Sequence, residues 1–200
     1  MPSKPALEFW FEFASTYSYL SVARIEPLAE AAGVEVRYRP FLLGPIFAAQ
    51  GWNTSPFVLY PVKGRYMWRD IERRAALYGL PFRIPDHFPQ NGLLPARIAL
   101  IAADEGWCLS FARAVYNAEY AEGLDISEES VIYGLLSSLH QSADQIISRA
   151  SAEKNKLLLR DSTEEAGRRG VFGAPTFIVG EELFWGDDRL EDALAFAASI

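Results

Sequence analysis

The chain has 200 residues, half of them apolar and 14% aromatic, which is enough for one hydrophobic core and argues against disorder. Its formal net charge of −7 argues against nucleic acid and anionic membranes as partners, because neutralising phosphates requires a basic face. The only cysteine, Cys108, leaves no disulfide framework and no zinc pattern, so no metal site is expected.

Two strands joined by a helix are predicted at the N-terminus. Residues 7–13 alternate apolar residues with Glu8, Trp10 and Glu12, and this period of two is typical of a strand. Ser15 then offers an N-cap for an amphipathic helix that ends at Gly33. A second strand over residues 34–41 follows at once, so the region is a βαβ unit.

The middle of the chain is predicted to be helical. Residues 44–85 are rich in glycine, proline and aromatic residues, and one helix is predicted there, over 65–78. From residue 94 to about residue 166 the apolar periodicity is almost entirely that of helices. The predicted helices span residues 94–106, 108–121, 128–140, 143–149 and 151–168.

The strand pattern returns after residue 170. Short β-rich runs at 176–179 and 182–185 are joined by Gly180-Glu181, which predicts a hairpin, and a helix over 188–198 closes the chain. The order βαβ, helical insertion, ββα is that of an α/β, thioredoxin-like fold with a mixed central sheet. We predict a thioredoxin-like domain from residues 1–43 and 170–200, with an inserted helical domain over 44–169.

Two segments carry the candidate chemistry of such a fold. A thioredoxin-type fold places a Cys-x-x-Cys dithiol at the start of its first long helix and faces it with a cis X-Pro-Thr loop. Here the dithiol positions are Ser15 and Ser18, and the loop is Gly173-Ala-Pro-Thr-Phe177. A hydroxyl cannot cycle between thiol and disulfide, so the site can only hold and polarise a thiol from outside, for which glutathione is the candidate.

Six short motifs in order make a family resemblance specific. The chain resembles the glutathione-dependent 2-hydroxychromene-2-carboxylate isomerases and the related kappa-class glutathione transferases, which share the split plan of the DsbA oxidoreductases. The motifs are Phe13-x-Ser-x-Tyr-Ser-Tyr-Leu20, Arg39-Pro-Phe-Leu-Leu-Gly44, Lys63-x-x-Tyr66 with Asp70, Phe88-Pro-x-Asn91, Gly170-Val-Phe-Gly-x-Pro-Thr-Phe177 and Gly186-x-Asp-Arg-Leu190. One departure is Thr16, where the family usually has proline, and we expect it to change rigidity more than chemistry.

The resemblance implies how the thiol would be held. The Ser15 hydroxyl would hydrogen-bond the glutathione sulfur at the helix N-terminus and help to hold it as the thiolate. A cis Ala174-Pro175 bond would expose the backbone of Ala174 to pair with the backbone of the glutathione cysteine. From the local sequence alone, a plain N-cap is the favoured interpretation of Ser15, and Ala174-Pro175 could be an ordinary turn before a strand.

The resemblance also places the other end of glutathione at the start of the last helix. There the backbone N–H groups, the Asp187 or Asp188 side chain and Arg189 would hold the γ-glutamyl end. The pattern Asp188-x-x-Glu191 is also that of a capping box, so a simply capped helix is the alternative interpretation.

Further candidate contacts come from the loop-rich segment. Lys63, Asn53 and Asn91 match positions where the family contacts glutathione or substrate, although a solvated surface residue is the alternative. Aromatic residues that could line a pocket for an aromatic substrate are Phe47, Trp52, Phe57, Tyr60 and Trp185. Core or dimer packing would explain these aromatic residues equally well.

The implied function is that of a glutathione-dependent isomerase of aromatic degradation. It would convert 2-hydroxychromene-2-carboxylate, or a similar intermediate, to trans-o-hydroxybenzylidenepyruvate through a glutathione adduct. One alternative is a kappa-like transferase or peroxidase that consumes glutathione, and another is a DsbA-like peptide-binding module without redox chemistry.

No apolar run approaches the roughly 20 residues of a membrane span, and the N-terminus is too short and charged for a signal-peptide core. A cytoplasmic protein is therefore expected, and the resemblance implies a homodimer.

Overall fold

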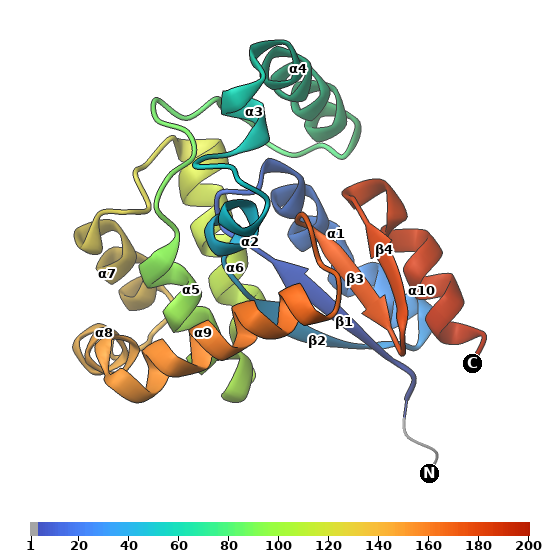
Figure 1. The fold of residues 1–200 in the computed structure, drawn as a ribbon. Helices are drawn as coiled ribbons and strands as arrows, with labels where there is room; N and C mark the ends of the chain where they lie inside the picture. Colours follow the sequence, from blue (N-terminus) through green and yellow to red (C-terminus); the bar gives the residue numbers. More distant parts are fainter. Residues whose placement is uncertain (1–3) are drawn as a thin grey trace.

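The computed structural model describes residues 4–200; residues 1–3, part of the predicted first domain and of the stretch considered for a targeting signal, lie outside the described residues. Helices and strands alternate only at the two ends of the chain (Figure 1). The elements are β1 (Ala6–Phe11), α1 (Thr16–Ala32), β2 (Glu35–Pro40), α2 (Leu43–Ala49), α3 (Pro56–Leu59), α4 (Pro61–Leu77), α5 (Leu93–Asp104), α6 (Cys108–Asn117), the π-helical turn η1 (Ala118–Glu122), α7 (Glu129–Ser138), α8 (Ala143–Ser151), α9 (Glu153–Arg168), β3 (Thr176–Val179), β4 (Glu182–Trp185), the 3-10 turn η2 (Asp187–Arg189) and α10 (Leu190–Ala198).

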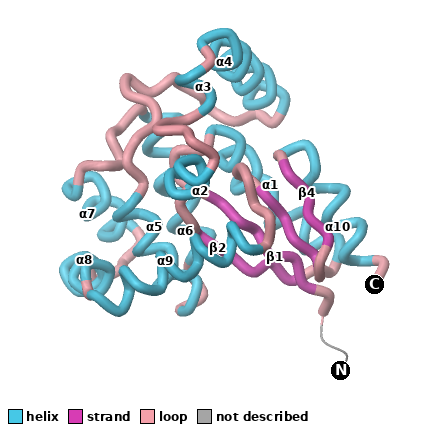
Figure 2. The backbone as a smooth tube through the Cα atoms, in the orientation of Figure 1, coloured by secondary structure: helices cyan, strands magenta, loops and turns pink. Residues whose placement is uncertain are grey.

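The four strands form one mixed sheet in the order β2-β1-β3-β4. Strand β1 pairs parallel with β2 and antiparallel with β3, and β3 pairs antiparallel with β4 across the Gly180-Glu181 turn. The predicted hairpin and mixed sheet are therefore confirmed. In Figure 2 the strands lie between α10 on one side and most of the helices of the segment between β2 and β3 on the other.

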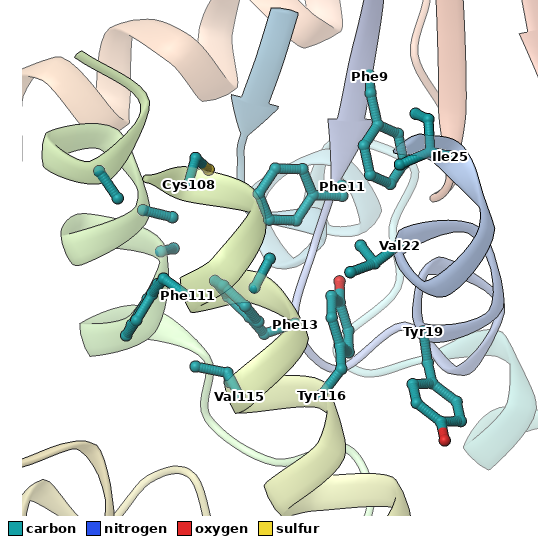
Figure 3. Close-up of a cluster of buried hydrophobic side chains, with 14 of the residues drawn as sticks. Phe9, Phe11, Phe13, Tyr19, Val22, Ile25, Cys108, Phe111, Val115 and Tyr116 are labelled. Carbon is teal, nitrogen blue, oxygen red and sulfur yellow. The ribbon is translucent and has the colours of Figure 1, made fainter. Parts of the chain in front are cut away.

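Both faces of the sheet are covered, which the alternation in β1 explains. Phe9 and Phe11 point into the main core, where α1 and α6 pack (Figure 3). Trp10, on the opposite face, packs in a second cluster with Phe41 and with Ala166 of α9. The strand ends at Phe11, two residues before the predicted end, and the chain turns there toward the N-terminus of α1.

The first helix has the predicted ends. The Ser15 hydroxyl accepts the Ser18 N–H, and Gly33 closes the helix in the left-handed conformation with φ 67°. Two short helices, α2 and α3, lie in the segment predicted to be mostly loop, and α4 begins at Pro61 rather than residue 65. Pro56 and Pro61 each occupy a first helical turn, where proline is pre-organised, so these residues initiate helices here instead of breaking them.

Gly64 sets the contact between α3 and α4, which carry part of the cavity wall described below. A Cβ at this position would lie 2.3 Å from the backbone carbonyl oxygen of Phe57. We expect Gly64→Ala to destabilise the protein by about 1–3 kcal/mol in denaturant unfolding, because backbone must move. The control is Gly134→Ala in α7, because a Cβ at this position has no neighbouring atom within 4 Å. This substitution should stabilise the helix by about 0.5–1 kcal/mol. Equal stability of the two variants would contradict this account.

Candidate active site

A cavity of about 1250 Å³ opens where the N-terminus of α1 meets the loop before β3. Its other walls come from the segment 42–57, from α4, from residues 88–93 and from the turn that follows β4. The cavity therefore lies between the sheet and the helical segment, and residues far apart in the sequence meet in it.

Ser15 stands at the inner end of this cavity. Its hydroxyl donates to the carbonyl oxygen of Ala174 at 2.9 Å and accepts the Ser18 N–H at 3.2 Å. The Ala174-Pro175 bond is cis, as predicted, so the ordinary-turn alternative is wrong. A second cis bond, Phe88-Pro89, was not predicted. The Ser15 hydroxyl is thus an N-cap that also joins the two segments expected to flank a bound thiol.

The structure brings most of the predicted site residues into this one cavity. Tyr60, Pro175 and Arg189 are not among the lining residues: Pro175 follows Ala174 in the loop, and Arg189 pairs with Asp188 and Asp192. The predicted residues that line the cavity are Ser15, Phe47, Trp52, Asn53, Phe57, Lys63, Asn91, Ala174, Trp185, Asp187 and Asp188.

The Asp187 carboxylate is buried and already paired with protein groups, so it is not free to bind the ammonium group of a ligand. Arg24 of α1 contacts one oxygen at 3.0 Å, and Arg74 of α4 contacts the other at 2.8 Å. Ser21 and Tyr78 donate further hydrogen bonds at 3.0 and 3.2 Å. Asp187 therefore fixes two guanidinium groups at the cavity edge, and Arg74 is itself a lining residue.

The capping box predicted for the last helix is absent from the structure. Neither η2 nor α10 has a side-chain cap, and Asp188 pairs with Arg189 instead. The 3-10 turn over residues 187–189 moves the start of the α-helix to Leu190, so Asp188 does not occupy the N-cap position.

The polar residues from the loop-rich segment are exposed at the cavity rim. The Lys63 ammonium lies 4.9 Å from the centre of the Tyr60 ring. Asn91 accepts the Leu93 N–H at 3.0 Å and so helps to begin α5. Asn53 is exposed and has no hydrogen bond among the described side chains, so it is free to meet a ligand.

Two aromatic pairs line the cavity. Phe47 and Trp52 have ring centres 5.7 Å apart, and Phe172 and Trp185 have ring centres 4.9 Å apart. Trp185 is 52% exposed, and Phe47 and Trp52 are half-buried, so none of the three belongs to the core. The core interpretation of these three residues is therefore wrong.

Sequence reasoning missed Glu12 as a functional candidate because it placed the residue within a strand. The strand ends first, and the Glu12 side chain lines the cavity while remaining only 8% exposed. Burial raises the pKa of its carboxyl from 4.5 to about 7. A signal was present in the sequence: an acidic residue three positions before Ser15, in an otherwise aromatic run.

The raised pKa of Glu12 predicts a dependence of stability on pH. The folded protein holds a proton that the unfolded chain loses above pH 4.5, so the free energy of unfolding should fall as the pH rises toward about 7. The loss should reach about 3 kcal/mol and level off above that pH. Denaturant unfolding of the wild type and Glu12→Gln across this window measures it. A pH-independent difference between the two proteins would contradict the assignment.

Cys108 lies in the main core, away from the cavity (Figure 3). Burial raises the pKa of its thiol to about 12, so it is not a reactive thiolate. Within residues 4–200 no cluster of His, Cys, Asp and Glu is arranged to hold a metal ion. In the same residues no helix has the length and apolar character needed to cross a bilayer.

Comparison with known proteins agrees with this geometry. The DSBA-like thioredoxin domain family matches residues 6–196. The chain is 30% identical to a 2-hydroxychromene-2-carboxylate isomerase of Sphingobium xenophagum over 92% of this chain and 94% of that protein. It is 26% identical to glutathione S-transferase kappa 2 of Caenorhabditis elegans, over 99% and 94% of the two chains. A solved structure of a 2-hydroxychromene-2-carboxylate isomerase aligns with a TM-score of 0.86 at 28% identity, covering 96% of this chain and 95% of that one.

Proposed function

Because the chain belongs to the DSBA-like thioredoxin domain family, we propose that it is a glutathione-dependent isomerase. Its substrate is 2-hydroxychromene-2-carboxylate or a similar intermediate of aromatic degradation, and its product is trans-o-hydroxybenzylidenepyruvate or the corresponding acid. The observation that carries the proposal is the Ser15 hydroxyl, hydrogen-bonded to Ala174 beside the cis proline in a large cavity with no cysteine in its wall.

The residues present fit glutathione. Ser15 offers a hydroxyl donor at a helix N-terminus, where partial positive charge favours a thiolate. Ala174 offers backbone for the cysteine of the peptide, with cis Pro175 fixing the loop behind it. When bound, glutathione supplies a sulfur nucleophile that adds to the conjugated acid and leaves again after a bond rotation.

The γ-glutamyl end of glutathione carries a carboxylate and an ammonium group, and the cavity edge offers both charges. Arg74, held by Asp187, suits the carboxylate. Asp188, whose side chain is 55% exposed, suits the ammonium group. Arg189 pairs with Asp188 at this end, and Lys63 and Asn53, which also line the cavity, would contact the remainder of the peptide.

The acceptor would lie between the aromatic pairs. The lining rings of Phe47, Trp52 and Trp185 suit a flat aromatic ring. Asn53 or Asn91 can donate to the carboxylate of the acceptor. A homodimer in the cytoplasm completes the proposal. The exposed apolar side chains Val62 and Tyr66 on α4 support dimerisation, because they lie beside the cavity and would be covered by a partner.

A kappa-class glutathione transferase or peroxidase is the second candidate, favoured by the similarity to the Caenorhabditis elegans transferase over almost the whole chain. It would use the same thiol site, so the two activities differ in the fate of glutathione: the isomerase returns it and the transferase or peroxidase consumes it.

The test is a calorimetric titration of the protein with glutathione, together with the ultraviolet absorbance of the thiolate. Saturable binding with a thiolate signal at neutral pH is the expected result. Turnover of 2-hydroxychromene-2-carboxylate with constant glutathione would then support the isomerase, and loss of glutathione to a halogenated or peroxide acceptor would support the transferase. No binding at millimolar glutathione would overturn both and favour a peptide-binding module.

A further inference from the structure

Glu12 is an acid in the wall of the proposed thiol site, and the reaction outlined above assigns it no task. It precedes Ser15 by one turn of chain, and the Ser15 N–H donates to its carbonyl oxygen at 3.0 Å. Its carboxyl oxygen Oε1 lies 3.3 Å from the point that a Cβ on Gly92 would occupy. The carboxyl therefore lies beside Gly92, and Gly92, Ser15 and Glu12 all line the cavity.

No base neutralises this carboxyl among the described residues. The elements packed behind it, α6 and η1, contribute Tyr116, whose hydroxyl donates to the Glu12 carbonyl at 2.7 Å, and the buried Glu119. Neither carboxyl oxygen of Glu119 has a hydrogen-bond partner within residues 4–200, and burial holds the pKa of this carboxyl well above its usual value, so it stays protonated and adds no charge beside Glu12. The other charged residues that line the cavity are Lys63, Asp70, Arg74, Asp187 and Asp188.

We propose that Glu12 is the proton acceptor for the thiol that binds at Ser15, an inference that rests on the proposed function. The S–H bond breaks, an O–H bond forms on the Glu12 carboxylate, and the negative charge moves from Glu12 to the sulfur. Nothing is oxidised or reduced, and the proton returns to the sulfur when the thiol leaves.

The environment of Glu12 makes this transfer favourable. An exposed glutamate is too weak a base for a thiol of pKa about 8.5, whereas burial raises the pKa of Glu12 to about 7. The N-terminus of α1 lowers the pKa of a bound thiol below its usual value of about 8.5. The pKa of the thiol and the raised pKa of Glu12 therefore approach each other. Transfer also leaves one negative charge in the cavity wall, whereas a thiolate beside an ionised Glu12 would place two there.

The experiment counts protons. Glutathione is titrated into the protein at about pH 7.5 in buffers of different ionisation enthalpy, and the protons released are divided by the thiolate measured from its absorbance. We expect about one proton per thiolate in Glu12→Gln and only about a fifth of a proton in the wild type, because Glu12 retains the rest. In the wild type the number should rise toward one at about pH 6, where Glu12 is protonated before glutathione binds.

Glu119→Gln is the matched control, because it removes an equally buried carboxyl that does not line the cavity, and it should keep the wild-type proton count. A count near one proton in the wild type at every pH, or a count raised by Glu119→Gln, would overturn the assignment to Glu12. The wild-type pH series decides the question even if Glu12→Gln fails to fold. Thiolate formation with the wrong proton count defeats only this inference, whereas absent binding defeats the proposed function.

Discussion

Ser15→Ala is expected to lower kcat/KM of the glutathione-dependent reaction by about a hundred- to a thousandfold. This is the usual cost of removing one preorganised donor from a developing or bound anion. In the structure the Ser15 hydroxyl has one proton and now gives it to the Ala174 carbonyl, 2.9 Å away. A bound sulfur would receive that proton, and alanine offers none. Steady-state kinetics and the thiolate absorbance of the glutathione complex measure the effect.

The same substitution also removes a helix cap, so its two consequences need to be separated. Ser15 accepts the Ser18 N–H, and losing this cap should cost about 1 kcal/mol of stability. Ser15→Asp keeps an acceptor at the cap but has no proton to donate at neutral pH. We expect Ser15→Asp to retain the helix cap, to lose the hydrogen bond to the Ala174 carbonyl and to be as inactive as Ser15→Ala. An active Ser15→Asp protein would show that Ser15 matters only as a cap.

Asp187→Ala is expected to destabilise the protein by about 3–5 kcal/mol, because it leaves two guanidinium groups without their buried partner. Arg24 and Arg74 lie 3.0 and 2.8 Å from the Asp187 carboxylate, whose side chain is only 1% exposed. The three residues come from α1, α4 and η2, so this cluster ties α1 and the turn after β4 to α4. For a chain of this length the melting temperature should fall by about 10 °C in a thermal melt.

Asp188→Ala is the matched control for this prediction. Asp188 is the next residue, carries the same charge and has a side chain that is 55% exposed, paired with Arg189 on the surface. Its removal should change stability by less than about 0.5 kcal/mol. If both variants had the same melting temperature, the buried cluster around Asp187 would not hold α1, α4 and η2 together as described.

The outlines of the fold follow from local patterns in the sequence. Alternation predicted β1, and Ser15 and Gly33 predicted the ends of α1, because a cap hydroxyl and a left-handed glycine act on their own turn. The Gly180-Glu181 pair predicted the β3–β4 hairpin in the same way. Where several turn-forming residues follow one another, between residues 44 and 65, the local signal favoured loop, and α2 and α3 were missed.

The sequence by itself also pointed to the proposed thiol site, since Ser15 and the Gly173–Phe177 loop lie at positions that this family fold brings together. Only the tertiary structure decided the state of the charged groups. Asp187 pairs with the guanidinium groups of Arg74 and Arg24, which are 113 and 163 residues away in the chain. Glu12 lies just beyond the end of β1, and its side chain is buried in the cavity wall. Both outcomes depend on which distant segments exclude water from a side chain, and desolvation of that kind leaves no trace in local periodicity.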